Sequence, residues 1–448
     1  MQRETKKAFK KDITNKKKKV VLCVILLSFG VLAVCKYTNF MIGNINGILS
    51  AFGSRGRLSV LKLTLPLGIS FYTFQSVSYV VDVYRGKHEP QKNFFKYALF
   101  VSFFPQLLQG PIGRYERLGE QLYEGHAYDL KNIQFGLQRI LWGMLKKMVL
   151  ADRVNAAVML IFNNYWNYGG WINVFGVILY SIQLYADFSG GIDITIGIAQ
   201  MFGITMDENF RQPYFSRSIG EFWRRWHITL GTWMKDYIFY PFSLSRCMNK
   251  FGKWCKKTFG NNVGKLLPVS LANLLVFFIV GIWHGAAWKY IMYGMYNGVI
   301  IAASGMLAPV YARIHESLHI NPKSWWYQVF CIIRTFILVN IGFYFDMAPD
   351  LHAANVMLLD TVTKAHLSQI SMATVKAVGL TAQDLIIVAA GCIIIFVVSI
   401  LKEKNIKIRE AVASRNIVLR WFIYIVFIMF ILIYGSTSTT SDFIYANF

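Results

Sequence analysis

Apolar stretches recur along almost the whole chain and are separated by shorter polar segments. Because the hydrocarbon core of a bilayer is about 30 Å thick, roughly 20 apolar helical residues are enough to cross it. Several of the stretches are short or contain Gly and Pro, so we expect some to be re-entrant or to lie in the interface. The pattern predicts an all-α, polytopic transmembrane helical bundle with spans near 20–35, 58–81, 94–112, 133–162, 171–187, 190–204, 266–283, 287–307, 327–346, 383–401 and 417–435.

The composition supports a membrane protein. Of the 448 residues, 55% are hydrophobic and only 16% are charged, whereas roughly a quarter of the residues of a soluble protein are charged. Spans of a membrane bundle pack on one another throughout, so we expect a single integral-membrane domain at 20–448 behind a basic cytoplasmic tail at 1–19.

The net charge of +24 at first suggests a nucleic-acid partner. The basic residues, however, lie between the apolar runs, as they do in the cytoplasmic loops of membrane proteins. Lys16–Lys19 directly precede the first span, which predicts a cytoplasmic N-terminus in contact with anionic membrane lipids. No small-residue cleavage site follows Cys35, so we expect a retained anchor helix and not a signal peptide. The prediction is a multi-pass protein of the cell membrane with no nucleic-acid partner.

The six cysteines form no C-x-x-C pair and show no metal-ligand spacing. Four of them lie inside apolar runs, where cysteine behaves as a small hydrophobic residue. We therefore expect neither disulfides nor a metal site.

The polar stretch from about 206 to 265 is basic and rich in aromatic residues. Within it, residues 219–240 are predicted to form one helix, because Phe222, Trp226, Trp233 and Tyr237 can share an apolar stripe. Aromatic and arginine side chains mixed in this way are typical of a helix lying flat in the headgroup layer. The excess of basic residues puts this segment on the cytoplasmic side.

A second irregularity is the proline- and glycine-containing stretch 105–111. Non-helical backbone at membrane depth is tolerated only where it faces protein or a water-filled cavity. If the break lies within the bilayer, it predicts a cavity or a protein-buried site.

Ionisable residues in apolar sequence are functional candidates, because the bilayer makes them costly. Six of the eight histidines lie in or beside polar loops: His88, His126, His315, His319, His352 and His366. His284 instead lies in an apolar run, between Trp283 and Trp288, which could wall a pocket. Its imidazole could act as a general base on a hydroxyl or thiol, or it could be a buried structural histidine.

His227 follows Arg224, Arg225 and Trp226. The two arginines disfavour its cationic form, and their planar guanidinium groups suit phosphate or carboxylate. An interfacial helix that contacts lipid headgroups is the alternative.

Asp187 and Asp193 are acids embedded in apolar sequence. They could pair with arginines of the 211–225 segment or orient a histidine, and we favour structural pairing over a metal site. Serine-hydrolase and ATPase motifs are absent.

A set of short motifs along the chain resembles one known family. In chain order they are 66–75 (PLGISFYTFQ), 82–86 (DVYRG), 109–112 (QGPI), 185–190 (YADFSG), 208–210 (ENF), 216–218 (SRS), 221–227 (EFWRRWH) and 281–285 (GIWHG). They are similar to motifs of the membrane-bound O-acyltransferases, in the branch of the alginate O-acetyltransferases and teichoic-acid D-alanyltransferases. The best-matched core is 60–300.

The resemblance implies spans arranged around a membrane-crossing tunnel, with His284 as the catalytic residue at its constriction and His227 as the second histidine. The implied reaction moves an acyl group from a cytoplasmic thioester to a hydroxyl presented from outside. A dry constriction would suppress hydrolysis of the thioester. The residues expected to contact substrates are Trp283, Trp223, Arg224, Arg225, Trp226, Asp187, Ser189, Asn209 and Gln75.

The leading hypothesis is acetylation of an exported cell-surface polysaccharide, with acetyl-CoA or another acyl thioester as donor substrate, no bound cofactor and an extracytoplasmic transfer partner protein. The first alternative is D-alanyl transfer to teichoic acid from a carrier-protein thioester. A non-enzymatic transporter or flippase is the alternative of another class. Met347 stands where the family commonly has arginine, so we assign no role to the region beyond residue 340.

Overall fold

The computed structural model describes residues 2–63, 66–107, 109–436 and 443, and only the backbone of residues 2–11. The described chain is helical and contains no strand. The first elements are α1 (Gln2–Ala51), α2 (Ile69–Tyr84), α3 (Phe94–Ser102), α4 (Phe104–Leu107), α5 (Tyr115–Tyr123), α6 (Leu130–Met144), the π-helix η1 (Leu145–Ala151), α7 (Asp152–Asn163), η2 (Tyr165–Asn167) and α8 (Trp171–Met201). They are followed by η3 (Pro213–Phe215), α9 (Ile219–Arg225), α10 (Ile228–Met234), η4 (Lys235–Phe239), α11 (Tyr240–Ser243), α12 (Arg246–His284), α13 (Trp288–Met306), α14 (Ala308–Ser317), α15 (Trp325–Met347), α16 (Leu351–Thr363), η5 (Leu367–Gln369), α17 (Met372–Ala377), α18 (Ala382–Glu403), α19 (Ile408–Ala413) and α20 (Ile417–Tyr434).

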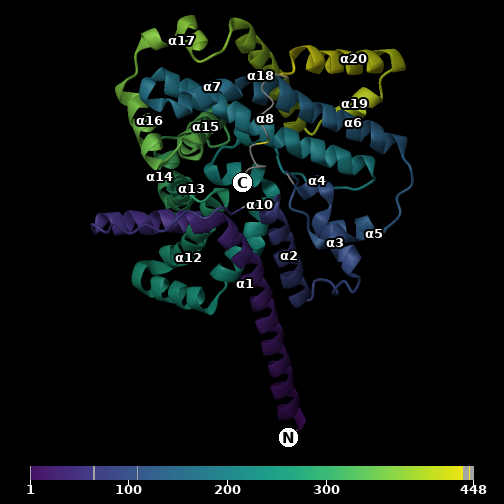
Figure 1. Ribbon diagram of the computed structural model, residues 1–448, viewed down its shortest axis with the longest axis vertical. Coiled ribbons are helices and arrows are strands. Elements are labelled where there is room, and N and C mark those ends of the chain that lie inside the picture. Colours follow the sequence, from purple (N-terminus) through teal and green to yellow (C-terminus); the bar gives the residue numbers. More distant parts are fainter. Residues whose placement is uncertain (1, 64–65, 108, 437–442, 444–448) are drawn as a thin grey trace.

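Six helices of the described chain are long and apolar enough to cross a membrane: α1, α8, α12, α15, α18 and α20. The pair α13 and α14 adds a seventh if it is one span, bent by 57°. The predicted polytopic helical bundle is confirmed, with fewer long spans than the eleven apolar stretches suggest. Helix α1 includes both the basic tail and the first span; it bends where it reaches the other helices, and its N-terminal part extends away from them (Figure 1).

The predicted span at 58–81 is wrong in its first half, because α2 begins only at Ile69. Residues 54–63 are not helical and pair with α1 through two asparagines. The side chain of Asn39 both donates to and accepts from the backbone of Leu61, and Asn46 does the same with Leu58. These amides satisfy backbone groups that a helix would have paired internally.

The two spans predicted at 171–187 and 190–204 are a single helix, α8. Glycines of both helices let α8 and α6 touch backbone to backbone. A Cβ on Gly143 would lie 2.5 Å from the carbonyl oxygen of Gly190, and a Cβ on Gly136 would lie 2.6 Å from that of Gly197. Small residues that permit such close approach are typical of helix pairs in membranes.

Helices α12 and α13 pack in a similar way beside the candidate site. A Cβ on Gly281 would lie 2.5 Å from the carbonyl oxygen of Tyr290, and a Cβ on Gly294 would lie 2.2 Å from that of Phe277. The small residues around His284 therefore accommodate α13.

The single helix predicted for 219–240 is wrong. Helix α9 ends at Arg225, and α10 begins at Ile228. Between them Trp226 is extended and pairs with Phe210 in an isolated antiparallel bridge, while His227 adopts a left-handed conformation with φ 44°. Local propensity favoured one helix, but this long-range backbone pairing overrides it.

The aromatic residues expected to face the headgroup layer lie inside the protein. Phe222, Trp226 and Trp233 are all at most 2% exposed, and Tyr237 is partly buried. The break at His227 is therefore part of the protein core.

Candidate active site

His284 is the last residue of α12 and is buried, with 3% of its surface exposed. Helix α1 holds this end of α12. The ammonium of Lys36 donates to the carbonyl of Trp283 (2.6 Å), and the hydroxyl of Tyr37 donates to that of Ile282 (2.7 Å). Carbonyls at a helix C-terminus lack partners within the helix, so these side chains stabilise the turn that carries His284.

A buried carboxylate lies beside His284. The Nδ1 atom of His284 is 3.5 Å from Oδ1 of Asp346, near the end of α15. The other carboxylate oxygen accepts a hydrogen bond from the hydroxyl of Tyr180 (2.7 Å). Lys289 donates to the carbonyls of Asp346 (3.1 Å) and Ala348 (2.7 Å), which fixes this end of α15. A carboxylate on Nδ1 favours the tautomer that leaves Nε2 able to accept a proton.

His227 is fixed by a buried asparagine. The backbone N–H of Thr229 donates to Oδ1 of Asn209 (3.0 Å), so that atom is the acceptor. Nδ1 of His227 lies 3.2 Å from the same oxygen and must therefore carry its proton. The Thr229 hydroxyl also donates to Oδ1 (2.9 Å) and accepts from the N–H of Ile112 (3.0 Å). The stretch 109–112 thus supports the turn at His227.

His227 is electrically neutral in this setting. Burial, reinforced by the nearby His284, lowers the pKa of His227 to about 3. A neutral imidazole with its proton on Nδ1 presents Nε2 as an acceptor.

Both histidines contact the indole ring of Trp283. The ring centroid of Trp283 is 5.5 Å from that of His227 and 5.2 Å from that of His284. Tyr293 contacts His284 from α13 (5.3 Å), and Phe188 contacts His227 from α8 (4.9 Å). Residues that the sequence places far apart therefore form one buried aromatic and imidazole cluster.

Gln75 and Gln109 are buried polar residues without partners. They are 1% and 2% exposed, and neither amide atom of either side chain has a hydrogen-bond partner in the described part of the chain. Leaving a buried polar atom unpaired costs about 1–3 kcal/mol. These unpaired amides are therefore suited to form hydrogen bonds with a polar substrate or with water.

Trp223 and Trp226 have structural contacts. The indole N–H of Trp223 donates to Asn297 on α13 (3.0 Å), and its ring contacts Tyr293 (6.2 Å), which itself contacts His284. Trp226 stacks on Phe222 in the core (5.4 Å). Both tryptophans position the helices around the histidines.

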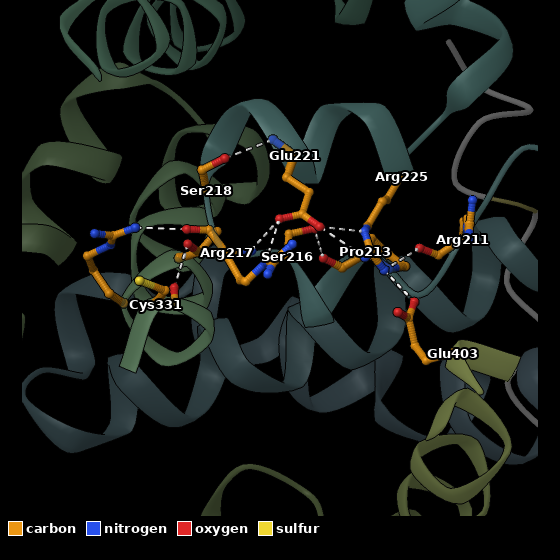
Figure 2. Close-up of polar contacts among 11 residues, drawn as sticks. Arg211, Pro213, Ser216, Arg217, Ser218, Glu221, Arg225, Cys331 and Glu403 are labelled. Carbon is orange, nitrogen blue, oxygen red and sulfur yellow. Dashed lines mark hydrogen bonds and ion pairs between the residues drawn. The ribbon is translucent and has the colours of Figure 1, made fainter. Parts of the chain in front are cut away.

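The two arginines of α9 differ sharply. Figure 2 shows the guanidinium of Arg225 between the carboxylates of Glu221 and Glu403, so this side chain ties α9 to the end of α18. It also donates to the carbonyl of Arg211 (3.4 Å). Arg224 is exposed. Of the two, Arg224 alone is placed to meet an anionic group arriving from solvent.

The start of α9 is also tightly held (Figure 2). The hydroxyl of Ser218 accepts from the N–H of Glu221 (3.1 Å), whose carboxylate accepts from the N–H of Arg217 (2.9 Å). Although burial raises the pKa of Glu221, the Arg217 N–H and the Arg225 guanidinium lower it below its usual value. The cap keeps the turn at His227 at a fixed distance from α15, where Arg334 donates to the carbonyl of Arg217 (2.8 Å).

Asp187 and Ser189 belong to a buried ion-pair network between α8 and η1. Lys147 lies 2.7 Å from Asp187 and 2.9 Å from Asp152. Lys146 donates to Ser189 (2.8 Å) and Asp193 (2.5 Å). The described ion pairs of these acids thus use lysines of η1 and, for Asp193, Arg139 on α6 (2.8 Å), in place of the arginines of 211–225.

Three residues of these buried networks were not predicted from the sequence: Lys146, Lys147 and Asp346. Lys146 and Lys147 are adjacent cations inside the apolar run 133–162, a signal that marks intramembrane ion pairs. Asp346 also lies in an apolar run, but the end of that run resembles an ordinary span boundary.

Trp288, which was expected to wall a pocket, is 56% exposed and donates to Asn44 on α1 (2.8 Å). Among the described residues no three His, Cys, Asp or Glu side chains gather to hold a metal ion.

A multi-helix membrane bundle with a buried histidine pair is the architecture expected of a membrane acyltransferase. Residues 91–345 match the membrane-bound O-acyltransferase (MBOAT) family. The chain is 34% identical to a probable alginate O-acetylase of Pseudomonas syringae pv. tomato over 75% of its own length and 59% of the relative's, and 34% identical to one of Pseudomonas putida over 80% and 70%. It is 29% identical to a teichoic acid D-alanyltransferase of Bacillus subtilis over 64% and 69%. The chain belongs to the membrane-bound O-acyltransferase family, and it spans less than two thirds of the length of the Pseudomonas syringae relative.

Proposed function

We propose that the protein transfers an acyl group, acetyl in the leading case, from a cytoplasmic thioester to a hydroxyl of an exported cell-surface polysaccharide. The observation that carries the proposal is the buried pair His284 and His227, both in contact with the ring of Trp283, with Asp346 beside His284. The similarity to probable alginate O-acetylases supports an acetyl group and a polysaccharide acceptor.

In this mechanism His284 is the general base. Its Nε2 accepts the proton of the acceptor hydroxyl while the hydroxyl oxygen attacks the thioester carbonyl carbon. The carbon–sulfur bond then breaks, the imidazolium returns the proton to the departing thiolate, and the products are an ester and a free thiol. Asp346 stabilises the imidazolium between these steps, as a carboxylate does behind a catalytic histidine.

His227 takes the supporting role. As a neutral acceptor held by Asn209, its Nε2 can receive a hydrogen bond from a substrate group without competing for the proton that His284 moves. Gln75 and Gln109 offer amide donors and acceptors to polar parts of the substrates. Arg224 is the side chain of α9 that we assign to the anionic end of the donor, with acetyl-CoA as the proposed donor.

The remaining parts of the proposal concern the surroundings. The two substrates would meet in a tunnel across the membrane, with the N-terminus and the 206–265 segment on the cytoplasmic side, as the distribution of basic residues favours. A partner protein outside the membrane would complete delivery to the polymer.

The test measures ester-linked acetyl groups on surface polysaccharide in cells that carry wild type, His284→Ala, His227→Ala or His352→Ala. His352 is an exposed histidine and serves as the matched control. We expect loss of acetylation by at least about a hundredfold in His284→Ala, a clear reduction in His227→Ala and no change in the control, all at equal protein level in the membrane. Normal acetylation in His284→Ala would overturn the assignment and would favour a transporter.

The identity of the transferred acyl group is tested by supplying two donors to membrane vesicles that contain the protein. Labelled acetyl-CoA should transfer its acetyl group, whereas D-alanine carried as a thioester on a phosphopantetheine carrier protein should not. The reverse result would establish the alternative suggested by the similarity to the teichoic acid D-alanyltransferase.

A further inference from the structure

A large cavity lies beside the segment that carries His227, and Ile228 is one of its lining residues. Its volume is about 660 Å³, and its walls come from α6, α18, α19 and α20 with the 208–212 segment as floor. Figure 1 shows α19 and α20 beside α6, and the hydroxyl of Tyr424 on α20 accepts hydrogen bonds from Gln134 (2.9 Å) and Gln138 (2.7 Å) on α6. Two of the wall helices, α18 and α20, are long and apolar enough to cross the membrane.

The lining of the cavity changes from charged to apolar along one face of α18. Lys402, Val398 and Ile394 all line it and succeed one another at four-residue intervals. At 1.5 Å per residue the face extends roughly 12 Å from the lysine to the isoleucine. Trp142 and Phe427 close the apolar part, stacked at 6.4 Å. A ligand that fits has a charged end and an apolar chain.

The charged end of the cavity carries four cations that form no ion pair with a carboxylate among the described residues: Lys402, Lys407, Arg409 and Arg211. Asp193 attracts Lys402 and Glu410 attracts Arg409, but neither acid contacts its cation directly. Arg409 is held in place by the carbonyl of Phe135 (3.2 Å) and by the Gln200 amide oxygen (3.0 Å), both uncharged.

The acids of the lining are mostly neutralised already. Arg139 contacts Asp193, which also pairs with Lys146, and it binds Glu208 with both terminal guanidinium nitrogens. Glu410 is the remaining carboxylate of the lining. The cavity therefore carries a net positive charge that suits a phosphate group.

The cavity does not lead directly to the histidines. Phe210 on its floor packs on Phe188 at 4.9 Å, and Phe188 packs on His227 at the same distance. Along this path two aromatic rings separate the cavity from the imidazole, although Ile228, the neighbour of His227, also lines the cavity. On the opposite side α20 faces outward, and its one buried residue is Ile431. The cavity is consequently more accessible to membrane lipid than to the site of acyl transfer.

We propose that this cavity binds an anionic phospholipid, with its phosphate at Lys402 and Arg409 and an acyl chain along Val398, Ile394 and Phe427. Basic pockets between spans on the cytoplasmic side are typical binding sites for such headgroups. The lipid would bridge α18 and α20, and this role is independent of the acyl group or acceptor that the protein uses.

The experiment measures lipid bound to the purified full-length protein by native mass spectrometry, after incubation with phosphatidylglycerol or with phosphatidylcholine of the same chains. The variants are Lys402→Gln with Arg409→Gln, Val398→Trp to fill the apolar part, and Lys404→Gln as matched control. Lys404 lies two residues from Lys402 but outside the cavity lining. Each lost cation should weaken phosphatidylglycerol binding by roughly fivefold, so the double variant should bind roughly 25-fold more weakly.

The expected pattern is preference for phosphatidylglycerol in wild type and in Lys404→Gln, and loss of that preference in the double variant and in Val398→Trp. Equal weakening by Lys404→Gln and the double variant would mean general surface attraction and would overturn the proposal. Free coenzyme A and inorganic phosphate are added as competitors. If coenzyme A but not phosphate displaces the bound phosphatidylglycerol, the cavity is a site for the thioester donor. If both displace it, the cavity is a simple phosphate site. Either result would overturn the proposal of a lipid site.

Discussion

Asp346 lies directly behind His284, with 3.5 Å between Oδ1 of the carboxylate and Nδ1 of the imidazole. The contact joins α12 to α15 and is reinforced from α8 by the Tyr180 hydroxyl. Because all three groups are buried, the low local polarity strengthens their mutual orientation. The geometry makes Asp346 a positioning residue for the proposed base.

Asp346→Asn tests that role. The asparagine keeps the size of the side chain but can donate to Nδ1, which would move the imidazole proton to Nε2 and leave His284 unable to accept a proton. We expect kcat to fall by about 10²- to 10⁴-fold with little change in KM, measured on protein reconstituted in vesicles. Tyr180→Phe keeps the carboxylate and should cause a smaller fall. Equal kcat in wild type and Asp346→Asn would show that the contact is only structural.

Asn209→Asp should make the reaction sensitive to acid. The pKa of His227 in the wild type is lowered to about 3, so this histidine is neutral at physiological pH. A carboxylate on Nδ1 stabilises the imidazolium and raises that pKa. Activity that needs the neutral form is then lost as the pH falls through the raised pKa and recovers at higher pH.

The measurement is the pH dependence of kcat for Asn209→Asp, with Asn416→Asp as control. Asn416 caps α20 far along the chain, and aspartate preserves the cap. We expect kcat to begin falling at a higher pH in Asn209→Asp than in wild type, and no such change in Asn416→Asp. Identical profiles for both variants would remove His227 from the reaction.

Gly143→Ala should destabilise the bundle. Its added Cβ would lie 2.5 Å from the carbonyl oxygen of Gly190, a backbone atom that cannot move without separating α6 from α8. Overpacking of this kind costs about 1–3 kcal/mol. Thermal unfolding in detergent should show a lower midpoint than wild type, whereas Gly30→Ala, with no atom within 4 Å of its Cβ, should not. Equal midpoints for the two variants would mean that α6 and α8 can move apart to accommodate the added methyl group without loss of stability.

The hydrophobic pattern predicted the class of fold because membrane spans must be long and apolar. It failed where tertiary contacts decide backbone conformation. The pattern predicted two spans that separate at 187–190, but α8 continues there and Gly190 allows contact with α6. His227 lies at a break because Trp226 pairs with Phe210. Neither outcome can be read from the local sequence.

The candidate site was predicted in part. His284 and His227 stand out as histidines in unusual surroundings, and the structure brings both to Trp283. Asp346 could not be recognised, since its position behind His284 depends on how α15 packs against α12. Lys147 could have been, because a lysine in an apolar run requires a buried partner.

The neighbouring arginines of α9 offer a paired prediction. Arg225 is 18% exposed in its side chain and contacts Glu221 and Glu403, so Arg225→Gln should lower the free energy of unfolding by roughly 1–3 kcal/mol. Arg224 is exposed, so Arg224→Gln should leave stability unchanged but raise the KM for the thioester donor by roughly tenfold, the effect of losing one charged hydrogen bond. Thermal unfolding and donor titration on the same preparations separate the two effects. If Arg224→Gln leaves the donor KM unchanged, this arginine does not contact the donor, and another group must bind its anionic end.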